Sequence, residues 1–419
     1  MKQMIKKSKI RLSILLAVIF AISSLSGGTY SKAASKEKEV RAVWFSYLDI
    51  SEAKMNQMNE KQFTTYFSGV CSKLSGQNYN TLYVQVRPFG DAMYESSYFP
   101  WSVYASGQQG KDPGYDPLQI MIEQAKKYGL SVHAWINPYR IALGSTDINK
   151  LSKDNPARIW KSSDNKSTRR NVLSYNGSLY YNPASEEVRN LITNGVKEIV
   201  TKYDVDGIVF DDYFYPNLGS NYKKNFDYTE YKSYVNSSKE ENKGYKTIVN
   251  WRRENVNKLL KQIHTAIHKI DASVEFGISP AGNINNLYAV NNYYSDVKKW
   301  MASDEYIDYI SPQIYWSFSN SACPYKSTVD KWVSAKKSDD VDLYISLAGY
   351  RAGVSKTTAK NVLFDSGWYS RDKNILQKQV EYNRTIEQIS GFSIFRYSSF
   401  KSSSSGVKKE LKNLSSILK

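Results

Sequence analysis

Apolar and amphipathic segments alternate along the chain from residue 41 to its end. Short runs rich in Val, Ile and aromatic residues predict buried strands, and segments with apolar residues three and four positions apart predict helices. The predicted strands cover residues 41–47, 81–87, 131–137, the start of 206–216, 274–279, 307–315, 343–347 and 392–397. The predicted helices cover residues 59–75, 117–128, 185–202, 251–270, 293–302, 326–336, 374–389 and 407–418.

Eight strand–helix pairs in one chain predict a (β/α)8 TIM barrel of the α/β class. Two polar excursions, residues 139–183 and 217–249, predict long loop insertions after strands three and four. A doubly wound open sheet is the structural alternative. That fold would require a glycine-rich turn after the first strand, and residues 47–51 contain no glycine. We therefore expect one TIM-barrel domain over residues 34–419.

Residues 1–33 have the pattern of a cleaved secretory signal peptide. Five basic residues occur among the first eleven, an apolar run covers residues 14–22, and Ser31-Lys32-Ala33 offers the small-x-small pattern of a cleavage site. An uncleaved N-terminal anchor is the alternative, although the apolar run is short for a membrane span. We expect a secreted protein of the cell envelope, extracellular or periplasmic, without stable membrane insertion after cleavage.

The chain is strongly basic, with a formal net charge of +17. Cleavage after residue 33 would remove six basic and no acidic residues and leave +11. A basic exported protein is suited to polyanions such as the bacterial wall. Export, and the lack of a helix-turn-helix, zinc-finger or RNA-binding pattern, argue against nucleic acid as a partner. We expect a monomer.

The sequence predicts no cofactor and no metal ligand. Cys71 and Cys323 are the only cysteines, and two separate thiols are expected rather than a disulfide. His264 and His268 have the i, i+4 spacing that could hold a metal ion, but their apolar neighbours mark an ordinary amphipathic helix. A Ca²⁺ or Mg²⁺ ion in an acidic barrel mouth needs no recognisable motif and stays an open alternative.

The fourth strand ends in two adjacent carboxylates, Asp211 and Asp212, followed by aromatic residues. An unpaired buried carboxylate costs several kcal/mol or more, so a purely structural strand has no use for them there. In a TIM barrel the catalytic residues lie at the C-terminal ends of the strands. Strand alternation places Asp211 on the inward face, with Val209 and Tyr213, and Asp212 reaches the site only if the strand twists at its end.

Other strand ends add polar and aromatic side chains to the same rim. Strand alternation also predicts one shared inward face for Tyr83, Gln85 and Arg87. The candidate catalytic residues are Asp211, Asp212 and Asp91. The candidate substrate-binding residues are Arg87, Trp135, Asn137, Arg140, Tyr213, Gln313, Tyr315 and Trp316. An aromatic content of 14%, including 34 Tyr and 9 Trp, suits a carbohydrate binder because flat rings stack on sugars.

Several of these stretches together resemble glycosyl-hydrolase-like family 10. They are RAVW at 41–44, VRPFGDA at 86–92, HAWINPYR at 133–140, DGIVFDDY at 206–213, YNP at 181–183, NWRRENV at 250–256 and FGISP at 276–280. The resemblance implies a TIM barrel and a role in bacterial envelope glycan turnover. It further implies cleavage of peptidoglycan glycan strands from which the stem peptides were removed.

The run 206–211 also resembles chitinase-type barrels of glycoside hydrolase family 18. That family would have a carboxylate at Val209 and its acid Glu at Tyr213, so its mechanism does not transfer. Glycoside cleavage needs a carboxylic acid and a second carboxylate, about 5–5.5 Å apart for retention and about 6.5–9.5 Å for inversion. Asp211 is expected to be one of the pair, and Asp212 or Asp91 the other. The amide of an N-acetylated sugar can replace the nucleophile.

Each assignment has a structural alternative. Asp212 could cap the following loop, Arg87 could pair with Asp91, and Asn137 or Gln313 could satisfy backbone groups inside the barrel. Otherwise Arg87 and Arg140 would hold the acids ionised or bind a lactyl carboxylate. For the whole protein, the alternatives are a non-catalytic wall-binding lectin on the same barrel and a hydrolase of another secreted polysaccharide.

Overall fold

The structure is a computed structural model of the 419-residue chain, and it describes residues 39–237, 247–358, 365–369 and 374–419. The expected signal peptide, residues 1–33, lies outside the described residues and stays a prediction. Within the described ranges, no helix combines the length and the apolar character that crossing a membrane requires.

Eight parallel strands close into a barrel, in the order β1-β11-β10-β9-β8-β7-β3-β2. The strands are β1 (Val40–Phe45), β2 (Thr81–Arg87), β3 (Ser131–Ile136), β7 (Gly207–Asp211), β8 (Glu275–Ser279), β9 (Tyr309–Ile310), β10 (Asp342–Ala348) and β11 (Ile389–Phe395). Each pairs in parallel with the next, and β1 pairs with both β2 and β11. The predicted (β/α)8 barrel is confirmed.

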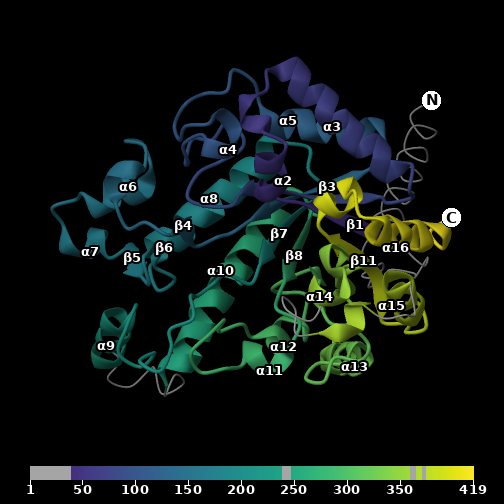
Figure 1. The fold of residues 1–419 in the computed structure, drawn as a ribbon. Helices are drawn as coiled ribbons and strands as arrows, with labels where there is room; N and C mark the ends of the chain where they lie inside the picture. Colours follow the sequence, from purple (N-terminus) through teal and green to yellow (C-terminus); the bar gives the residue numbers. More distant parts are fainter. Residues whose placement is uncertain (1–38, 238–246, 359–364, 370–373) are drawn as a thin grey trace, which may run out of the picture. The chain divides into compact units, whose positions relative to one another are not determined.

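Helices follow the strands and lie outside the barrel (Figure 1). The long ones are α3 (Glu60–Ser75), α5 (Pro117–Lys127), α8 (Glu186–Lys202), α10 (Ile248–Ile270), α13 (Tyr325–Ala335), α15 (Ile375–Asn383) and α16 (Ser405–Ser416). The short ones are α2 (Tyr47–Glu52), α4 (Val103–Ser106), α11 (Ile284–Leu287), α12 (Val297–Trp300) and α14 (Lys356–Thr358). Single 3₁₀ turns are η1 (Met55–Gln57), η2 (Ile148–Lys150), η3 (Gly349–Arg351), η5 (Ser366–Tyr369) and η6 (Tyr397–Lys401).

The two predicted insertions are present and carry secondary structure of their own. The first holds α6 (Pro156–Lys161), α7 (Lys166–Arg169) and a three-stranded antiparallel sheet of β4 (Arg140–Ala142), β5 (Val172–Tyr175) and β6 (Ser178–Tyr181). The second holds α9 (Tyr228–Ser237). Both follow strands whose C-terminal ends open at the same rim, so both can contribute to a site there.

The inside of the barrel is filled mainly by aromatic side chains. Trp44, Tyr83, Trp135, Tyr309 and Tyr344 pack with small aliphatic residues in one enclosed cluster. A second, larger cluster fills the layer between the strands and the helices. The barrel is therefore a packed core and not an open pore, as expected for eight strands.

His133 belongs to this interior and is not an acid or base. Its Nδ1 lies 2.9 Å from the hydroxyl group of Tyr309, and burial lowers the pKa of His133 to about 3. A glycine at position 277 makes room for the same tyrosine, because a Cβ there would lie 2.1 Å from the Tyr309 ring. Cys71 and Cys323 are both buried free thiols, as the sequence predicted.

Candidate active site

Asp211 and Asp212 lie at the C-terminal end of β7, as the sequence predicted. Val209 packs inside the barrel beside Trp135, and Asp211 follows two positions later on the same face. Asp211 aligns with Ser279 of β8. Only 2% of Asp211 and 6% of Asp212 is exposed. Two carboxyl groups are thus held out of water at the rim where TIM-barrel enzymes place their catalytic groups.

The carboxyl group of Asp211 stays largely protonated at neutral pH. Burial raises the pKa of Asp211 to about 8, the charge of Asp212 acts in the same direction, and Arg140 opposes them. The backbone N–H of Tyr213 donates to Oδ1 at 3.2 Å, and the indole group of Trp135 also favours the charged form. A carboxylic acid in this state can donate a proton near pH 7.

Asp212 is the more acidic member of the pair. Burial raises the pKa of Asp212 to about 6, while backbone amides, including that of Ala281, and the charge of Arg140 stabilise its anion. At pH 7 Asp212 is therefore largely ionised beside a largely protonated Asp211. Neighbouring acids whose environments separate their pKa values in this way are suited to different roles in one reaction.

Arg140 is the positively charged residue that acts on both carboxyl groups. It begins β4 in the first insertion, and its guanidinium carbon lies 3.2 Å from the ring centroid of Tyr213. Its charge lowers the pKa of both Asp211 and Asp212. The positive charge that stabilises the two carboxylates therefore comes from the first insertion and not from β7 itself.

Aromatic rings surround the carboxyl groups and reach solvent. Tyr315 stacks on Phe395 with centroids 5.9 Å apart, and Tyr350 packs edge-on against both rings. Burial raises the pKa of Tyr315 well above its ordinary value, and the hydroxyl groups of Tyr350 and Tyr213 and the charge of Asp212 act in the same direction, so Tyr315 lies near them. Tyr213 is 42% exposed and Tyr350 40% exposed, so the cluster has a solvent-facing edge. Such a surface can stack on sugar rings.

Two amide side chains complete the inner rim. Gln313 donates from Nε2 to the Ser279 carbonyl oxygen at 2.9 Å, and Asn137 donates from Nδ2 to the Pro88 carbonyl oxygen at 3.2 Å. Each thus satisfies backbone, the structural alternative foreseen from the sequence. The Oδ1 atom of Asn137 is buried without a hydrogen bond among the described residues and remains able to accept one.

Trp316 lies beside the loop after β8. A Cβ at Gly282 would approach the Trp316 ring within 2.8 Å, so this close packing requires a residue without a side chain there. The ring is partly exposed, and the backbone oxygen of Trp316 accepts from Gln379 of α15 at 3.0 Å. Trp316 is thus fixed next to the rim.

Arg87 does not share the inward face with Gln85, and that expectation was wrong. The register between β2 and β3 shifts between these two residues, which turns Arg87 to the helix side of the strand. There its guanidinium carbon lies 3.5 Å from the centroid of the Phe99 ring, and a Cβ at Gly195 of α8 would lie 3.0 Å from its Nη1. The side chain is fully buried and has no surface for a substrate.

Asp91 belongs to the neighbourhood of Arg87 rather than to that of Asp211. Its Oδ2 accepts from Gln109 at 2.9 Å, and it is 2% exposed. Burial raises the pKa of Asp91, while Gln109, Ser102 and Arg87 stabilise its anion. The structure therefore brings Asp212, and not Asp91, together with Asp211.

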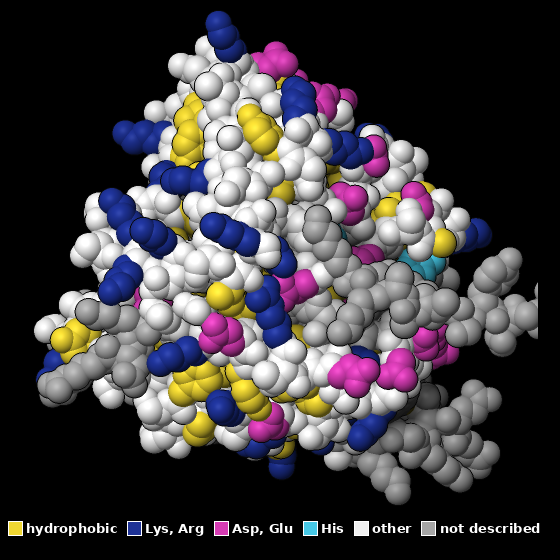
Figure 2. Space-filling view, turned by 90° about the vertical axis from the view of Figure 1, so that its right-hand side faces the viewer, with side chains coloured by type: hydrophobic (Ala, Val, Ile, Leu, Met, Phe, Trp, Pro, Cys, Tyr) yellow, Lys and Arg dark blue, Asp and Glu magenta, His cyan; other side chains and the backbone are white. Residues whose placement is uncertain are grey.

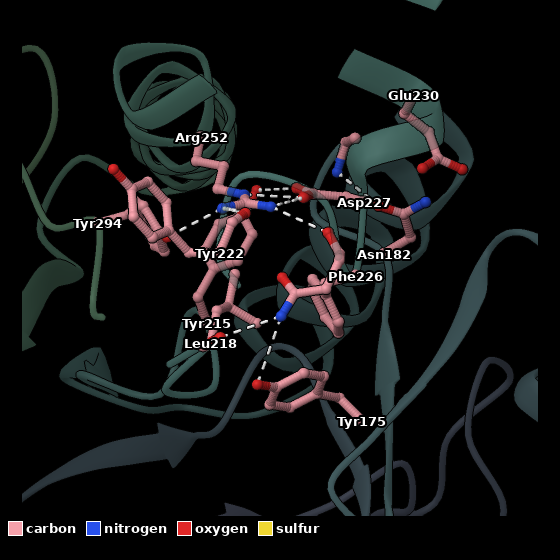
Figure 3. A network of polar contacts seen from close by, with 12 residues as sticks. Tyr175, Asn182, Tyr215, Leu218, Tyr222, Phe226, Asp227, Glu230, Arg252 and Tyr294 are labelled. Atoms are coloured by element: carbon pink, nitrogen blue, oxygen red, sulfur yellow. Dashed lines mark hydrogen bonds and ion pairs between the residues drawn. The ribbon is translucent and has the colours of Figure 1, made fainter. Parts of the chain in front are cut away.

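A buried ion pair fixes the loop that follows the two carboxylates (Figure 3). Arg252 of α10 and Asp227 of the second insertion are fully buried. The Nη2 atom of Arg252 lies 2.6 Å from Oδ1 of Asp227. Tyr215, three positions after Asp212, donates to Oδ2 of Asp227 at 2.9 Å, and Arg252 donates to the hydroxyl group of Tyr294 at 2.9 Å. The second insertion thus anchors the backbone next to the site.

Tyr293 was not predicted from the sequence to belong to the site. Burial raises the pKa of Tyr293, and the charge of Asp212 raises it further. Tyr293 and Tyr294 both adopt left-handed backbone conformations, with φ of 59° and 55°, inside a stretch where the sequence predicted a helix. Phe395 was also missed, because its role depends on stacking against Tyr315 from a distant strand. No local pattern in the sequence marks either residue.

The described residues also form a groove of about 650 Å³ between α13 and α15. It is lined by residues that include Phe318, Lys326, Ile375, Lys378 and Tyr382. These residues lie in the outer layer and do not include the rim carboxylates. We therefore place the candidate active site at the barrel rim.

Comparison with known proteins shows the family and the fold of the chain. The profile of the glycosyl hydrolase-like 10 family matches residues 39–363. Glycosyl hydrolase YngK of Bacillus subtilis is 36% identical over 397 residues, which span 90% of this chain and 72% of that protein. Glycosyl hydrolase DigH of Escherichia coli is 33% identical over 336 residues, which span 76% of this chain and 72% of that protein.

Solved structures share the fold at low sequence identity. The glycoside hydrolase domain of PgaB (BpsB) from Bordetella bronchiseptica has a TM-score of 0.53 and 12% identity, and the match covers 89% of this chain and 99% of that one. The catalytic domain of β-amylase from Paenibacillus polymyxa has a TM-score of 0.55 and 13% identity, with 91% and 98% covered. On the match of its family profile and these relatives, the chain belongs to the glycosyl hydrolase-like 10 family.

Proposed function

We propose that this protein is a glycoside hydrolase that cleaves bacterial cell-wall glycan outside the cytoplasm, acting on peptidoglycan strands that lack stem peptides. The observation that carries the proposal is the pair of adjacent buried carboxyl groups, with pKa values of about 8 for Asp211 and about 6 for Asp212. Relatives named glycosyl hydrolases support the reaction class. The basic mature chain and the resemblance noted in the sequence support the substrate class.

Asp211 acts as the proton donor in this mechanism. As the bond between the anomeric carbon and the leaving oxygen breaks, the carboxyl proton of Asp211 moves to that oxygen. The ionised Asp212 stabilises the positive charge that develops on the sugar ring. Water then adds to the anomeric carbon, and its proton returns to Asp211, so the enzyme is unchanged after one turnover.

The two carboxylates approach the substrate from one side. Side chains alternate along a regular strand, but the charge of Arg140 acts on both carboxyl groups, which favours an approach from the same side. Attack on the anomeric carbon from the opposite side therefore needs another group. The acetamido oxygen of an N-acetylated sugar meets that need, as in substrate-assisted glycosidases. It bonds to the anomeric carbon as the leaving oxygen departs, and the water that adds to this carbon afterwards breaks that bond and restores the acetamide. Peptidoglycan glycan consists of N-acetylated sugars, which makes it suitable for this geometry.

The remaining rim residues hold the sugar. Tyr315, Phe395 and the exposed Tyr213 and Tyr350 offer faces and edges for stacking. The free acceptor Oδ1 of Asn137 can take a hydrogen bond from a hydroxyl or acetamide group. Arg140 can bind a lactyl carboxylate while it keeps Asp212 ionised.

Digestion of purified sacculi tests the proposal. The wild-type protein is incubated with intact sacculi and with sacculi from which an amidase has removed the stem peptides, and soluble products are identified by mass spectrometry. We expect glycan fragments from the amidase-treated sacculi and little from the intact ones. The Asp211→Asn variant should release far less than the wild type, because it retains the shape of Asp211 without the transferable proton.

Binding measured on the same samples separates the alternatives. A lectin would sediment equally with sacculi as wild type and as Asp211→Asn, and would release nothing in either form, which would contradict the proposal. Release from another secreted polysaccharide, and none from amidase-treated sacculi, would contradict the substrate class. Asp91→Asn is the matched control, because this buried acid lies outside the Asp211 pair and its variant should still cleave.

A further inference from the structure

Two histidines and one aspartate meet at the N-terminal end of the barrel, opposite the candidate active site. His264 and His268 lie one turn apart near the end of α10, and Asp308 immediately precedes β9. The Nε2 atom of His264 lies 3.2 Å from Oδ1 of Asp308, and that of His268 lies 3.1 Å from Oδ2. We propose that these three side chains form a zinc-binding site.

The separations between the ligand atoms fit a zinc ion. Bonds of about 2.0–2.2 Å at tetrahedral angles place neighbouring ligand atoms about 3.3–3.6 Å apart. The distance of 3.2 Å from Nε2 of His264 to Oδ1 of Asp308 is close to this range, and one ligand atom from each of the three residues lies within 4.8 Å of the others. Two imidazole nitrogens and one carboxylate oxygen leave the fourth position for water.

The side chains are held for this role by their surroundings. The two imidazole rings have centroids 4.1 Å apart, so both face the same point from one side of α10. Oδ2 of Asp308 also accepts the backbone N–H of Phe276 in β8 at 2.6 Å. Oδ1 can then bind the metal while Oδ2 keeps the amide, the kind of second contact that orients metal-binding carboxylates.

An ion can reach this cluster from solvent. The side chains of His264, His268 and Asp308 are 11%, 30% and 23% exposed. Histidine reaches the surface near acidic side chains on the face drawn in Figure 2. The other side chains with nitrogen or sulfur ligands for zinc, His133, Cys71 and Cys323, are buried. Zinc binding by the folded chain therefore has one clear histidine-containing site among the described residues.

Such a site would tie α10 to β8 and β9. Zinc binds the deprotonated Nε2 atom of each histidine, and each neutral imidazole then carries its proton on Nδ1. Because the site joins segments about forty residues apart, the ion would stabilise the end of the barrel away from the carboxylates. It plays no part in the glycosidic reaction.

The test uses the untagged protein, stripped with a chelator and dialysed against metal-free buffer. Isothermal titration with ZnCl₂ and thermal melts with zinc or chelator give affinity, stoichiometry and the shift in Tm. We expect one equivalent of zinc to bind at micromolar concentration or below and to raise Tm. Added Co²⁺ should give the visible absorption of a tetrahedral site.

Two variants each remove one ligand, and a third variant serves as the control. His268→Ala and Asp308→Asn should each lose the zinc-dependent Tm shift and weaken binding at least tenfold. Glu305→Gln changes an exposed neighbouring acid that pairs with Lys261, and it should bind zinc as the wild type does. No zinc binding by the wild type, or binding that His268→Ala leaves unchanged, would overturn the site. So would a loss of the same size in Glu305→Gln.

Discussion

Arg140 lies over the ring of Tyr213, with its guanidinium carbon 3.2 Å from the ring centroid. This stacking holds the cation beside Asp211 and Asp212, whose pKa values it lowers. The pair of acids thus depends on a residue from the first insertion, outside the barrel itself. A substitution of Arg140 should therefore change the pKa values of Asp211 and Asp212 while both of these side chains stay in place.

Replacing Arg140 by Gln should shift the pH profile of glycan cleavage to higher pH. Loss of the positive charge raises the pKa of both acids, so Asp212 ionises later and Asp211 keeps its proton longer. A rise of about one unit from the Asp212 pKa of about 6 lowers the ionised fraction of Asp212, and with it kcat/KM, about fivefold at pH 6. Arg140→Lys should lie between the two, because it keeps the charge but not the stacked plane. An unshifted profile in Arg140→Gln would contradict this electrostatic role.

Asp211 should make the folded protein less stable as pH rises. Its pKa is about 8 in the folded state, against 3.8 for an ordinary Asp, so between these values the folded state holds a proton that the unfolded state has lost. Stability therefore falls as pH rises through this window. Asp211→Asn removes the effect, so at pH 8 its free energy of unfolding should exceed that of the wild type by a difference on the order of a few kcal/mol. At pH 4 this difference between the variant and the wild type should be smaller. Urea unfolding at both pH values measures it.

The buried pair of Asp227 and Arg252 should be essential for stability near the site. Both side chains are fully buried, and removing one partner leaves an uncompensated charge. Asp227→Ala should cost about 3–5 kcal/mol in the free energy of unfolding. The exposed pair of Lys261 and Glu305 is the control, and Lys261→Ala should change stability little. Equal effects of the two variants in urea titrations would refute the difference.

Two glycines offer a test of the packing inside the barrel. A Cβ at position 277 would lie 2.1 Å from the Tyr309 ring, whereas one at Gly69 in α3 would have no atom within 4 Å. Gly277→Ala should destabilise the protein by about 1–3 kcal/mol, because the enclosed ring has little room to move. Gly69→Ala should stabilise it by about 0.5–1 kcal/mol through its higher helix propensity. Thermal melts of both variants show whether the signs differ.

Most of the barrel could be predicted from the sequence because its strands carry strong apolar runs. The predicted second strand, residues 81–87, has the observed bounds of β2. The predicted strand 307–315 shortens to Tyr309–Ile310, since Pro312 has no N–H to continue the ladder. The sheet β4-β6-β5 was missed because its short, partly polar strands pair only within the insertion.

The residues of the candidate site also differ in how well the sequence predicts them. Asp211 and Asp212 were predictable because acids directly after a buried strand stand out from their surroundings. The turned side chain of Arg87 was not, because an irregular register between two strands leaves no mark in one of them. Likewise, the spacing of His264 and His268 was visible, but Asp308 joins them only through the fold.

The most direct test of the account compares two substrates cleaved by wild type and Asp211→Asn. One is amidase-treated glycan, whose sugar leaving group needs a proton, and the other is an aryl glycoside of the same N-acetylated sugars, whose phenolate does not. We predict that Asp211→Asn lowers kcat by about 10²–10⁴-fold on the glycan and far less on the aryl glycoside. Equal losses on both substrates, or no loss on the glycan, would contradict the assignment of Asp211 as the proton donor.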